Sequence, residues 1–549
     1  MGRLSSIGSS VRQSVSDSAF ELKVLREAGV LGIERPSIAV RRGVTFVRWG
    51  ASPATGATTA AISHPHETAI IDDRGSLTFE QVHRRSNALA HAFAKMGIGY
   101  GDGVGIMCRN HRGFIEATLA AAKLGASALY LNTMFAGPQL VEVTRREKPK
   151  ALVYDEEFAD LLDGVDESVA RVVGWSEGEV EAQTIDSLVA DSDDSNLKPP
   201  PDKPRFVILT SGTTGTPKGA QRSSPDGLLA LAALIDKIPF RSRETMMIAA
   251  PLFHSWGFFH FVMSLPTAST IVLRRRFDEE GTLRAIEEHR AQVLAVVPVM
   301  LQRILRLPRE TLSAYDLSSL RITSVSGSAL PGELAIEWMD RFGDTVYNLY
   351  GSTEVAYATV ATPEDLRAAP GTAGRPPRGT VVRLYDEEGR EVPRGEVGRI
   401  FVGNEMSFEG YTGGGGKEVI DGLLCSGDVG HLDPGGRLFI DGRDDEMIVS
   451  GGENVFPREV EDLLADHAAV VEVAVIGVED EEFGQRLKAF VAIADGAQAT
   501  EDELKAHVKA NLASYKAPRE IEFLDELPRN ATGKVLKREL RERQASQST

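Results

Sequence analysis

Predicted strands and helices alternate along most of this chain, and this alternation restricts the fold more than any other feature of the sequence. From Glu67, a short apolar segment predicts a strand, and Thr78 can cap a helix that ends near Gly97. Another predicted helix ends at Gly125, between two further apolar segments. Because parallel strands need crossover helices, we expect an α/β fold with mostly parallel sheets covered by helices.

The pattern changes twice in the C-terminal third of the chain. Between Thr380 and Phe401, short predicted strands are separated by turns, which indicates a small β-rich, barrel-like subdomain. After Arg443, a helix, two strands, a second helix and a last strand predict an α+β unit of roughly 100 residues, long enough for its own core. The length of 549 residues is itself typical of roughly two to four domains.

Residues 1–50 precede the alternating pattern and form a separate N-terminal extension. Within it, residues 37–50 predict an amphipathic helix with valines on one face and arginines elsewhere. These residues are Val40, Val44, Val47, Arg41, Arg42 and Arg48. A basic amphipathic helix can lie on a membrane surface, whereas the alternative is a helix packed on the main domain. We therefore keep peripheral membrane contact through residues 37–50 as one of two hypotheses.

The charge balance argues against a nucleic-acid partner. The chain has 61 Lys and Arg against 79 Asp and Glu, a formal net charge of −18. A bound anion must therefore meet locally concentrated positive charge. Cys108 and Cys425 have no spacing typical of a zinc site, and so few cysteines fit a reducing cytosol. The chain start lacks an apolar stretch, and no run of roughly 18 apolar residues occurs. These features predict a cytoplasmic protein.

A glycine- and hydroxyl-rich segment follows a predicted strand that ends at Leu209. Glycines let the backbone approach a ligand closely, successive amides make an anion-binding turn, and a lysine adds a point charge for a phosphate. The segment contains Thr210, Ser211, Gly212, Thr213, Thr214, Gly215, Thr216, Lys218 and Gly219. It is no Walker A loop, because Pro217 precedes the lysine and a glycine follows it. We interpret it as a different phosphate-binding loop.

This loop resembles that of the adenylate-forming superfamily, which includes acyl-CoA synthetases, luciferase-like enzymes and peptide-synthetase adenylation domains. The similarity recurs over roughly residues 67–540. It implies ATP and Mg²⁺ as cofactors, a large domain of two helix-covered sheets with a β-barrel-like subdomain, and a small mobile C-terminal domain. We expect an AMP-binding domain over residues 51–442, a hinge over 443–445 centred on Asp445, and the C-terminal domain over 446–549.

The resemblance also implies a role for each further motif. His254, in PLFHSWG, would gate the carboxylate site. A small-residue segment would lie against adenine, and it comprises Ser326, Gly327, Ser328 and Ala329. The YGSTE motif would place a tyrosine on adenine, a threonine at the α-phosphate and a glutamate on Mg²⁺, a hard ion commonly held by one carboxylate and substrate phosphates. Its residues are Tyr350, Gly351, Ser352, Thr353 and Glu354.

The remaining motifs lie toward the C-terminus. Asp428 would accept hydrogen bonds from the ribose hydroxyls, and Arg443 would contact ribose and phosphate. Gly451 and Gly452 would line the tunnel for a thiol. Lys534, presented by the preceding turn, would be the catalytic lysine of adenylation. The catalytic residues that the resemblance implies are thus Lys534, Glu354, His254 and Thr214.

The expected reaction is that of an acyl-CoA ligase. A carboxylic acid and ATP would give acyl-AMP and pyrophosphate, and coenzyme A would then give acyl-CoA and AMP. Trp256, Phe258, Phe259 and Phe261 follow His254. The resemblance places this region beside the acid pocket, so we expect a hydrophobic acid. The N-terminal extension resembles that of bacterial fatty-acyl-CoA ligases, which favours a medium- or long-chain fatty acid.

Several alternatives stay open at this point. The acyl group could pass to a separate carrier protein, or the acid could be aromatic. A nucleotide-binding protein without ligase activity would need neither Lys534 nor Glu354, and a luciferase-like oxygenase would need a specialised substrate. The sequence does not indicate an oligomeric state.

Overall fold

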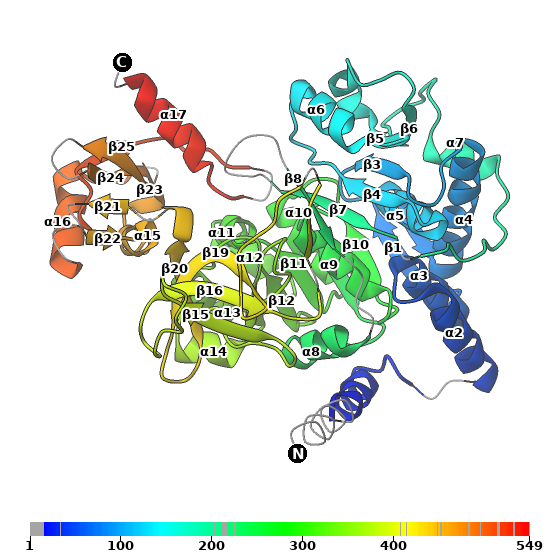
Figure 1. Ribbon diagram of the computed structural model, residues 1–549, viewed down its shortest axis with the longest axis horizontal. Helices are drawn as coiled ribbons and strands as arrows, with labels where there is room; N and C mark the ends of the chain where they lie inside the picture. Colours follow the sequence, from blue (N-terminus) through cyan, green and yellow to red (C-terminus); the bar gives the residue numbers. More distant parts are fainter. Residues whose placement is uncertain are drawn as a thin grey trace.

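The computed structural model describes residues 16–32, 35–202, 204–210, 218–222, 227–406, 408–412, 414–446, 448–450, 453–480, 484–494, 496–512, 516–530 and 533–547. The expected α/β class is confirmed, with two large sheets, a smaller antiparallel sheet and a separate C-terminal unit (Figure 1). Within the described residues, no helix is both long and apolar enough to span a membrane.

The first large sheet has seven strands, parallel at its centre and antiparallel at one edge. Its order is β17 (Phe408–Tyr411), β8 (Lys218–Arg222), β7 (Phe206–Thr210), β4 (Ser127–Tyr130), β3 (Gly103–Met107), β5 (Ala151–Asp155) and β6 (Ala170–Trp175). The associated helices are α4 (Phe79–Lys95), α5 (Arg112–Leu124), α6 (Gly137–Glu147) and α7 (Ile185–Ala190), with the 3₁₀ helix η1 (Glu156–Leu162). As predicted, Thr78 caps α4, and α5 ends at Gly125 in a left-handed conformation.

The second large sheet has eight strands. Its order is β14 (Thr359–Ala361), β13 (Val346–Tyr350), β12 (Ile322–Val325), β11 (Val293–Val296), β9 (Thr245–Ile248), β10 (Thr270–Leu273), β1 (Thr68–Asp72) and β2 (Gly75–Thr78). Its helices are α8 (Leu229–Lys237), α9 (Ser255–Ser264), α10 (Glu279–Glu288), α11 (Pro298–Leu305), α12 (Arg309–Ala314), α13 (Gly332–Phe342) and α14 (Pro363–Ala368). The first predicted strand, β1, pairs in parallel with the distant β10 and antiparallel with β2, the next strand along the chain.

The smaller sheet is antiparallel and lies beside the second large sheet (Figure 1). It contains β15 (Val381–Tyr385), β16 (Gly398–Gly403), β19 (Leu423–Leu432) and β18 (Val419–Ile420), and β20 (Leu438–Arg443) pairs with β19. A short 3₁₀ helix, η2 (Asp444–Glu446), follows β20 and leads into the C-terminal unit. The change of pattern after Thr380 thus corresponds to a real change of architecture.

The C-terminal unit has a sheet and hydrophobic clusters of its own. The strands are β22 (Glu453–Val455), β21 (Ile448–Ser450), β24 (Gly484–Ile493), β23 (Val470–Asp480) and β25 (Glu520–Phe523). Helices α15 (Pro457–Ala465), α16 (Glu501–Asn511) and α17 (Lys537–Gln547) accompany them. This unit touches the large domain where Gln302 Nε2 donates to the Val471 carbonyl at 3.4 Å.

Two helices of the N-terminal extension, and the helix that follows the extension, lie at the edge of the molecule. Residues 16–27 are helical, and Arg378 pairs with Asp17 there at 2.9 Å. Helix α3 (Pro53–Ser63) contributes buried residues to the large domain, whereas α2 (Pro36–Trp49) has none. Figure 1 shows α2 next to α3 at the periphery. The predicted amphipathic helix exists; it contacts α3 and has no buried residue.

Candidate active site

A cavity of about 1870 Å³ brings most of the predicted site residues together. Its polar end is lined by His254, Ser326, Gly327, Ser328, Ala329, Tyr350, Gly351, Ser352, Thr353, Glu354, Asp428, Arg443, Asn530, Gly533 and Lys534. These residues come from both large-domain and C-terminal segments, which are up to 280 positions apart between His254 and Lys534. The cavity continues into an apolar end along α8 and α9.

Tyr350, Asp428 and Arg443 form a connected polar group on one wall. Tyr350 ends strand β13, and its hydroxyl donates to Asp428 Oδ2 at 2.6 Å. Arg443 ends β20 and donates from Nη1 to Asp428 Oδ1 at 3.2 Å. Burial raises the pKa of Asp428, while Arg443, Tyr350 and Lys534 act in the opposite direction. A carboxylate oriented in this way can accept hydrogen bonds from a pair of hydroxyls.

Glu354 is oriented by two hydroxyl groups. Its Oε2 accepts from Ser352 Oγ at 2.9 Å, and its Oε1 accepts from Tyr411 Oη at 2.8 Å. The Ser352 hydroxyl also accepts from the Glu354 amide at 3.2 Å, so the turn from Ser352 to Glu354 orients the Glu354 carboxylate. Because each carboxylate oxygen has two acceptor sites, both oxygens of Glu354 retain capacity for a metal ion.

Lys534 reaches the cavity from a tight turn in the C-terminal unit. Its amide donates to Asn530 Oδ1 at 2.9 Å, and Arg529 Nη1 donates to the Gly533 carbonyl at 2.5 Å. Gly533 has φ +77°, and a Cβ at that position would overlap Val299 in α11 of the large domain. The turn is therefore pressed against the large domain, and only glycine fits at the contact.

His254 lies at the junction between the polar and apolar ends. It precedes the first residue of α9, and its Nδ1 is buried without a hydrogen-bond partner. Burial, and then the positive charge of Lys534, lower the pKa of His254 to about 4. The imidazole is therefore neutral at pH 7 and places no second cation beside Lys534.

The small-residue segments follow strands of the second sheet. Ser326 comes directly after β12, and Gly327 has φ +95°, a conformation that favours glycine. Gly351 follows β13, and a Cβ there would overlap the Ala356 carbonyl. Both segments thus present closely packed backbone to the cavity, which suits contact with a flat ring.

Part of the predicted site lies outside the described residues. Ser211, Gly212, Thr213, Thr214, Gly215 and Thr216 belong to this part, as do Gly451 and Gly452. The side chains of Thr210, Lys218 and Asp445 are likewise not described, although Thr210 pairs with Lys218 where β7 meets β8. The backbone of Asp445 lies in η2. The roles implied for these residues remain predictions.

Sequence reasoning missed several residues of the cavity wall, among them Tyr411 and Lys417. Tyr411, in β17, orients Glu354 as described, and burial followed by Glu354 raises its pKa. Lys417 lines the cavity. Its Nζ lies beside Gly427, 3.2 Å from the position that a Cβ on this glycine would take. The glycines at 414–416, just before Lys417, are exposed. The local sequence around Lys417 does not predict that it lines the cavity, because its position there depends on contacts with segments that are distant in the sequence.

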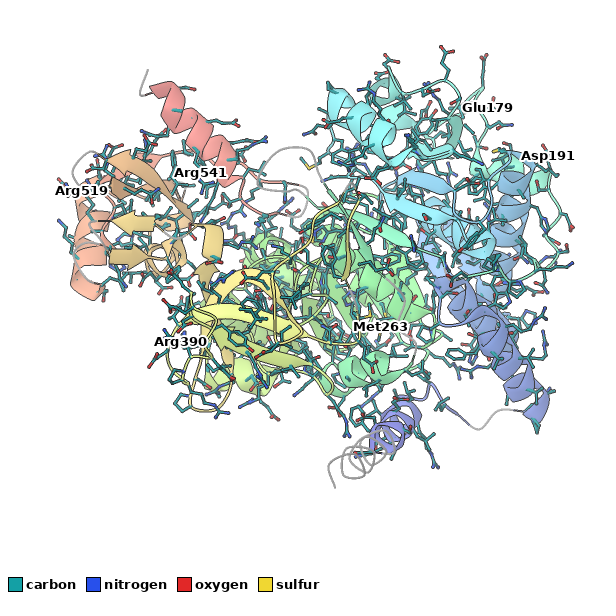
Figure 2. The ribbon with its side chains drawn as sticks, viewed as in Figure 1. Glu179, Asp191, Met263, Arg390, Arg519 and Arg541 are labelled. Atoms are coloured by element: carbon teal, nitrogen blue, oxygen red, sulfur yellow. The ribbon has the colours of Figure 1, made fainter. Side chains whose placement is uncertain are left out.

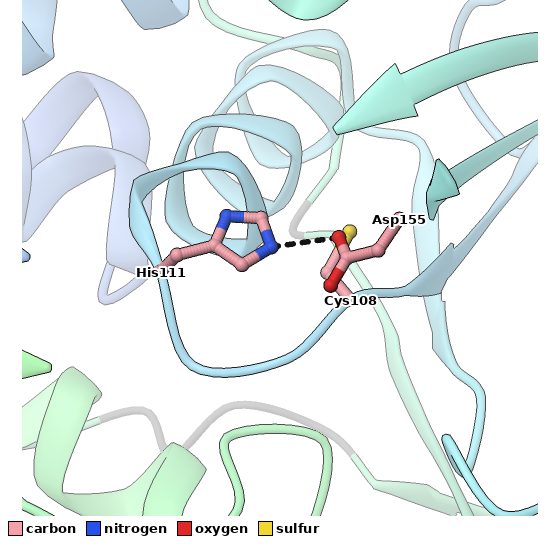
Figure 3. Close-up of side chains that lie close together, drawn as sticks. All are labelled: Cys108, His111 and Asp155. Carbon is pink, nitrogen blue, oxygen red and sulfur yellow. Dashed lines mark hydrogen bonds and ion pairs between the residues drawn. The ribbon is translucent and has the colours of Figure 1, made fainter. Parts of the chain in front are cut away.

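Cys108, His111 and Asp155 lie close together in the large domain (Figure 3), and none of them lines this cavity. His111 Nε2 is 2.7 Å from Asp155 Oδ1, and His111 Nδ1 accepts from the Gly113 amide at 3.0 Å. Both ring nitrogens are therefore occupied by protein partners. Burial is also the first cause that raises the pKa of the Cys108 thiol. The cluster is a buried hydrogen-bonded network with no free histidine nitrogen for a metal ion.

Comparison with known proteins identifies the family. Residues 58–412 match the model for AMP-binding enzymes, and residues 459–534 match the AMP-binding enzyme C-terminal domain. The chain belongs to the AMP-binding enzyme family. This AMP-binding enzyme is an AMP-forming acid–CoA ligase, which uses ATP and CoA and proceeds through an acyl-adenylate. The resemblance inferred from the motifs is confirmed.

The relatives of this AMP-binding enzyme differ in the acids that they are named for. It is 34% identical over 486 residues to a feruloyl-CoA synthase from Amycolatopsis, covering 87% of this chain and 96% of the relative. It is 31% identical to the fatty acid–[acyl-carrier-protein] ligase ScoC from Streptomyces coeruleorubidus, covering 87% and 94%. The structure of the anthranilate CoA ligase AuaEII with anthranoyl-AMP aligns with TM-score 0.80 and 25% identity, covering 89% and 96%.

Proposed function

We propose that this enzyme activates a hydrophobic aromatic carboxylic acid and transfers it to CoA. One observation carries the proposal: Lys534 and the Tyr350–Asp428–Arg443 group face the same cavity whose other end is apolar and aromatic. An acid bound at the apolar end would therefore direct its carboxylate toward ATP bound at the polar end. Holding two anions in this geometry is the main task of the first step.

At the polar end, this chain supplies groups suited to each part of ATP. Tyr350 and the segment from Ser326 to Ala329 would enclose adenine, and Asp428 would accept from the ribose hydroxyls. Arg443 and the phosphate loop would meet the phosphates. Lys534 would bridge the attacking carboxylate and the α-phosphate, which reduces the repulsion between the two anions. His254, neutral at pH 7, would shape the site without adding charge.

Mg²⁺ fits the Glu354 carboxylate. Glu354 lines the cavity, and Ser352 and Tyr411 fix its direction while both oxygens keep acceptor capacity. A bound Mg²⁺ would neutralise charge on the pyrophosphate group. We propose Glu354 as its protein ligand, with Tyr411 as the positioning residue.

The wall of the apolar end favours an aromatic acid. Phe206, Phe258 and Phe259 line the cavity, with Phe206 and Phe258 centroids 5.3 Å apart and Trp256 and Phe259 stacked at 5.4 Å. Such rings pack well against an aryl group. The feruloyl-CoA synthase and the anthranilate ligase support the same conclusion. They favour an aromatic acid over the fatty acid that we expected from the sequence.

A fatty acid remains the second candidate, because the apolar end continues past α9. Met263 and Leu265 line this extension, and Figure 2 shows Met263 within the large domain while the labelled charged residues lie at the periphery. The likeness to ScoC is consistent with a fatty acid and also with transfer to a carrier protein. The volume of the cavity, about 1870 Å³, is the specific feature that a long acyl chain would use.

The thioester step requires a different arrangement of the same cavity. Lys534 lines the cavity, and we propose that it blocks the approach of a thiol to the acyl-adenylate. We propose that the C-terminal domain, residues 446–549, rotates about the segment 443–445 to withdraw Lys534. Arg399 in β16 pairs with Asp444 at 2.9 Å beside the proposed hinge residue Asp445, so the large domain holds one side of this segment.

A panel of acids tests the proposal. Pyrophosphate release would be measured with ferulate, anthranilate, indoleacetate, octanoate, palmitate and acetate, and acyl-CoA would be identified by mass. We expect the highest kcat/KM with an aromatic acid, and product only when CoA is present. Preference for palmitate would favour the second candidate. Preference for acetate, or acyl transfer only to a carrier protein, would contradict the proposal.

A further inference from the structure

We propose that helix α2 binds the surface of an anionic lipid bilayer, so that the apolar end of the cavity faces the lipid. This inference rests on the proposed hydrophobic acid, and it assigns a partner to a surface that the reaction itself does not need. The first observation is that α2 has 14 residues and none of them is buried. A helix of this kind needs another surface to cover its apolar side chains.

The uncovered apolar side chains lie on one face of α2. Val40, Val44 and Val47 are spaced as on one side of a helix, and they are 64%, 50% and 85% exposed. Isolated exposed apolar residues are normal, but three on one helical face form a patch that favours contact with another apolar phase. These valines offer no hydrogen-bonding groups, so the patch is better suited to lipid than to a polar protein surface.

The positive charges around this face favour an anionic lipid. Residues 35–66 contain no Asp or Glu, although the whole chain has a net charge of −18. The same stretch holds Arg35, Arg41, Arg42 and Arg48. Arg41 and Arg48 are seven residues apart, so they flank the valines on one side of the helix. Arginines beside an apolar face are typical of helices that lie on anionic membranes.

The same helix also forms part of the cavity wall. Ala39, Gly43, Phe46 and Val47 line the cavity, together with Val262 of α9. Val47 is both 85% exposed and part of this lining, so the cavity reaches the molecular surface at α2. Leu31, which is 39% exposed, also lines the cavity. An apolar acid dissolved in a bilayer under α2 would therefore meet an apolar path toward His254.

The experiment is vesicle flotation of the full-length enzyme. Vesicles of phosphatidylcholine alone would be compared with vesicles that also contain phosphatidylglycerol. We expect binding to the anionic vesicles that weakens as salt is raised. The variant Val40→Glu/Val44→Glu should lower the apparent affinity by roughly tenfold or more, because it places charge on the apolar face. Arg41→Gln/Arg48→Gln should cause a loss of roughly tenfold.

The matched control is Val381→Glu/Val419→Glu, which changes two valines that are 46% and 58% exposed in the smaller sheet. It should bind vesicles as the wild type does. Wild-type protein that does not float with anionic vesicles would overturn the inference. Equal binding by the α2 variant, or salt-independent binding to phosphatidylcholine alone, would also overturn it. So would light scattering that shows α2-dependent dimers, since a second copy would then cover the helix.

An activity measurement separates this inference from the proposed function. With an acid dissolved in buffer, the Val40→Glu/Val44→Glu variant should keep wild-type rates, because neither valine lines the cavity. With the acid supplied in anionic vesicles, the variant should be slower by a factor near its loss of vesicle affinity. Loss of both activities equally would contradict a docking role. If no hydrophobic acid is activated, the proposed function fails, while flotation still reports on docking.

Discussion

The two ends of the cavity are built from different kinds of contact. At the polar end, Asp428 and Glu354 each have defined hydrogen-bond donors at 2.6–3.2 Å, so position and direction are fixed. At the other end, the aromatic side chains of α9 form an apolar wall that would contact a ligand by shape complementarity and not by hydrogen bonds. A polar network specifies one ligand chemistry, whereas an apolar wall accepts a range of molecules of suitable size. The first end therefore defines the reaction, and the second leaves the acid adjustable.

The largest effect that sharpens this contrast should come from Glu354→Gln. Loss of one charge at the polar end should lower the rate of pyrophosphate release by roughly 10²-fold for every acid, because the proposed role of Glu354 is toward ATP and not toward the acid. Stopped-flow pyrophosphate detection would measure this loss. The exposed control Glu310→Gln should be unaffected. A loss that depends on the acid would break the distinction between the two ends.

Tyr411→Phe should have a smaller and more specific effect. It removes the hydroxyl that donates to Glu354 Oε1 at 2.8 Å but leaves the carboxylate in place. We expect the Mg²⁺ concentration for half-maximal rate to rise by roughly tenfold, the usual cost of losing a partner that orients a metal ligand. Saturating Mg²⁺ should restore most of the rate. Tyr100→Phe, at a 55% exposed site, is the control; an unchanged Mg²⁺ requirement in Tyr411→Phe would remove its positioning role.

At the apolar end, Phe259→Ala should change which acids the enzyme prefers and leave the adenylation chemistry unchanged. The loss of a ring from the cavity wall should lower kcat/KM for large aromatic acids by roughly tenfold, within the range for altered apolar pockets. Acetate, which is too short to reach the ring, should be used as before. Rates with each acid would be compared with those of Phe523→Ala, whose side chain is 39% exposed in β25. Equal losses for all acids would show that the wall also serves ATP.

The smallest expected effect concerns pH. Because burial and Lys534 lower the pKa of His254 to about 4, its imidazole should stay neutral between about pH 5.5 and 8. The ratio of kcat/KM for the wild type and His254→Asn should therefore be constant in this window, since other ionisations cancel in the ratio. An inflection near the ordinary histidine pKa would show that His254 titrates and carries charge beside Lys534.

The sequence predicted the polar end better than it predicted its supporting contacts. Tyr350, Glu354 and Asp428 lie in short motifs with chemical meaning, and the structure brings all three to one cavity. Tyr411 lies 57 residues from Glu354, and nothing in its local sequence indicates their hydrogen bond. Such contacts arise from the pairing of β17 with β8, a long-range event that local patterns do not encode.

The same limit applies to the fold. Apolar periodicity and caps located α4 and α5, because those signals are local. They could not predict that β1 pairs with β10, some 200 positions later. For α2, the pattern predicted an amphipathic helix but left open whether the main domain covers it. The structure shows that α2 contacts α3 while its valines stay exposed.

The central claim is that Lys534, from the C-terminal unit, acts on the acid and ATP in the large-domain cavity. Its most direct test is to measure both half-reactions of Lys534→Ala against the exposed control Lys509→Ala. The account predicts that acid-dependent pyrophosphate release falls by at least roughly 10²-fold, while thioester formation from synthetic acyl-AMP and CoA stays within a few-fold of wild type. Near-normal pyrophosphate release, or equal loss of both half-reactions, would contradict it.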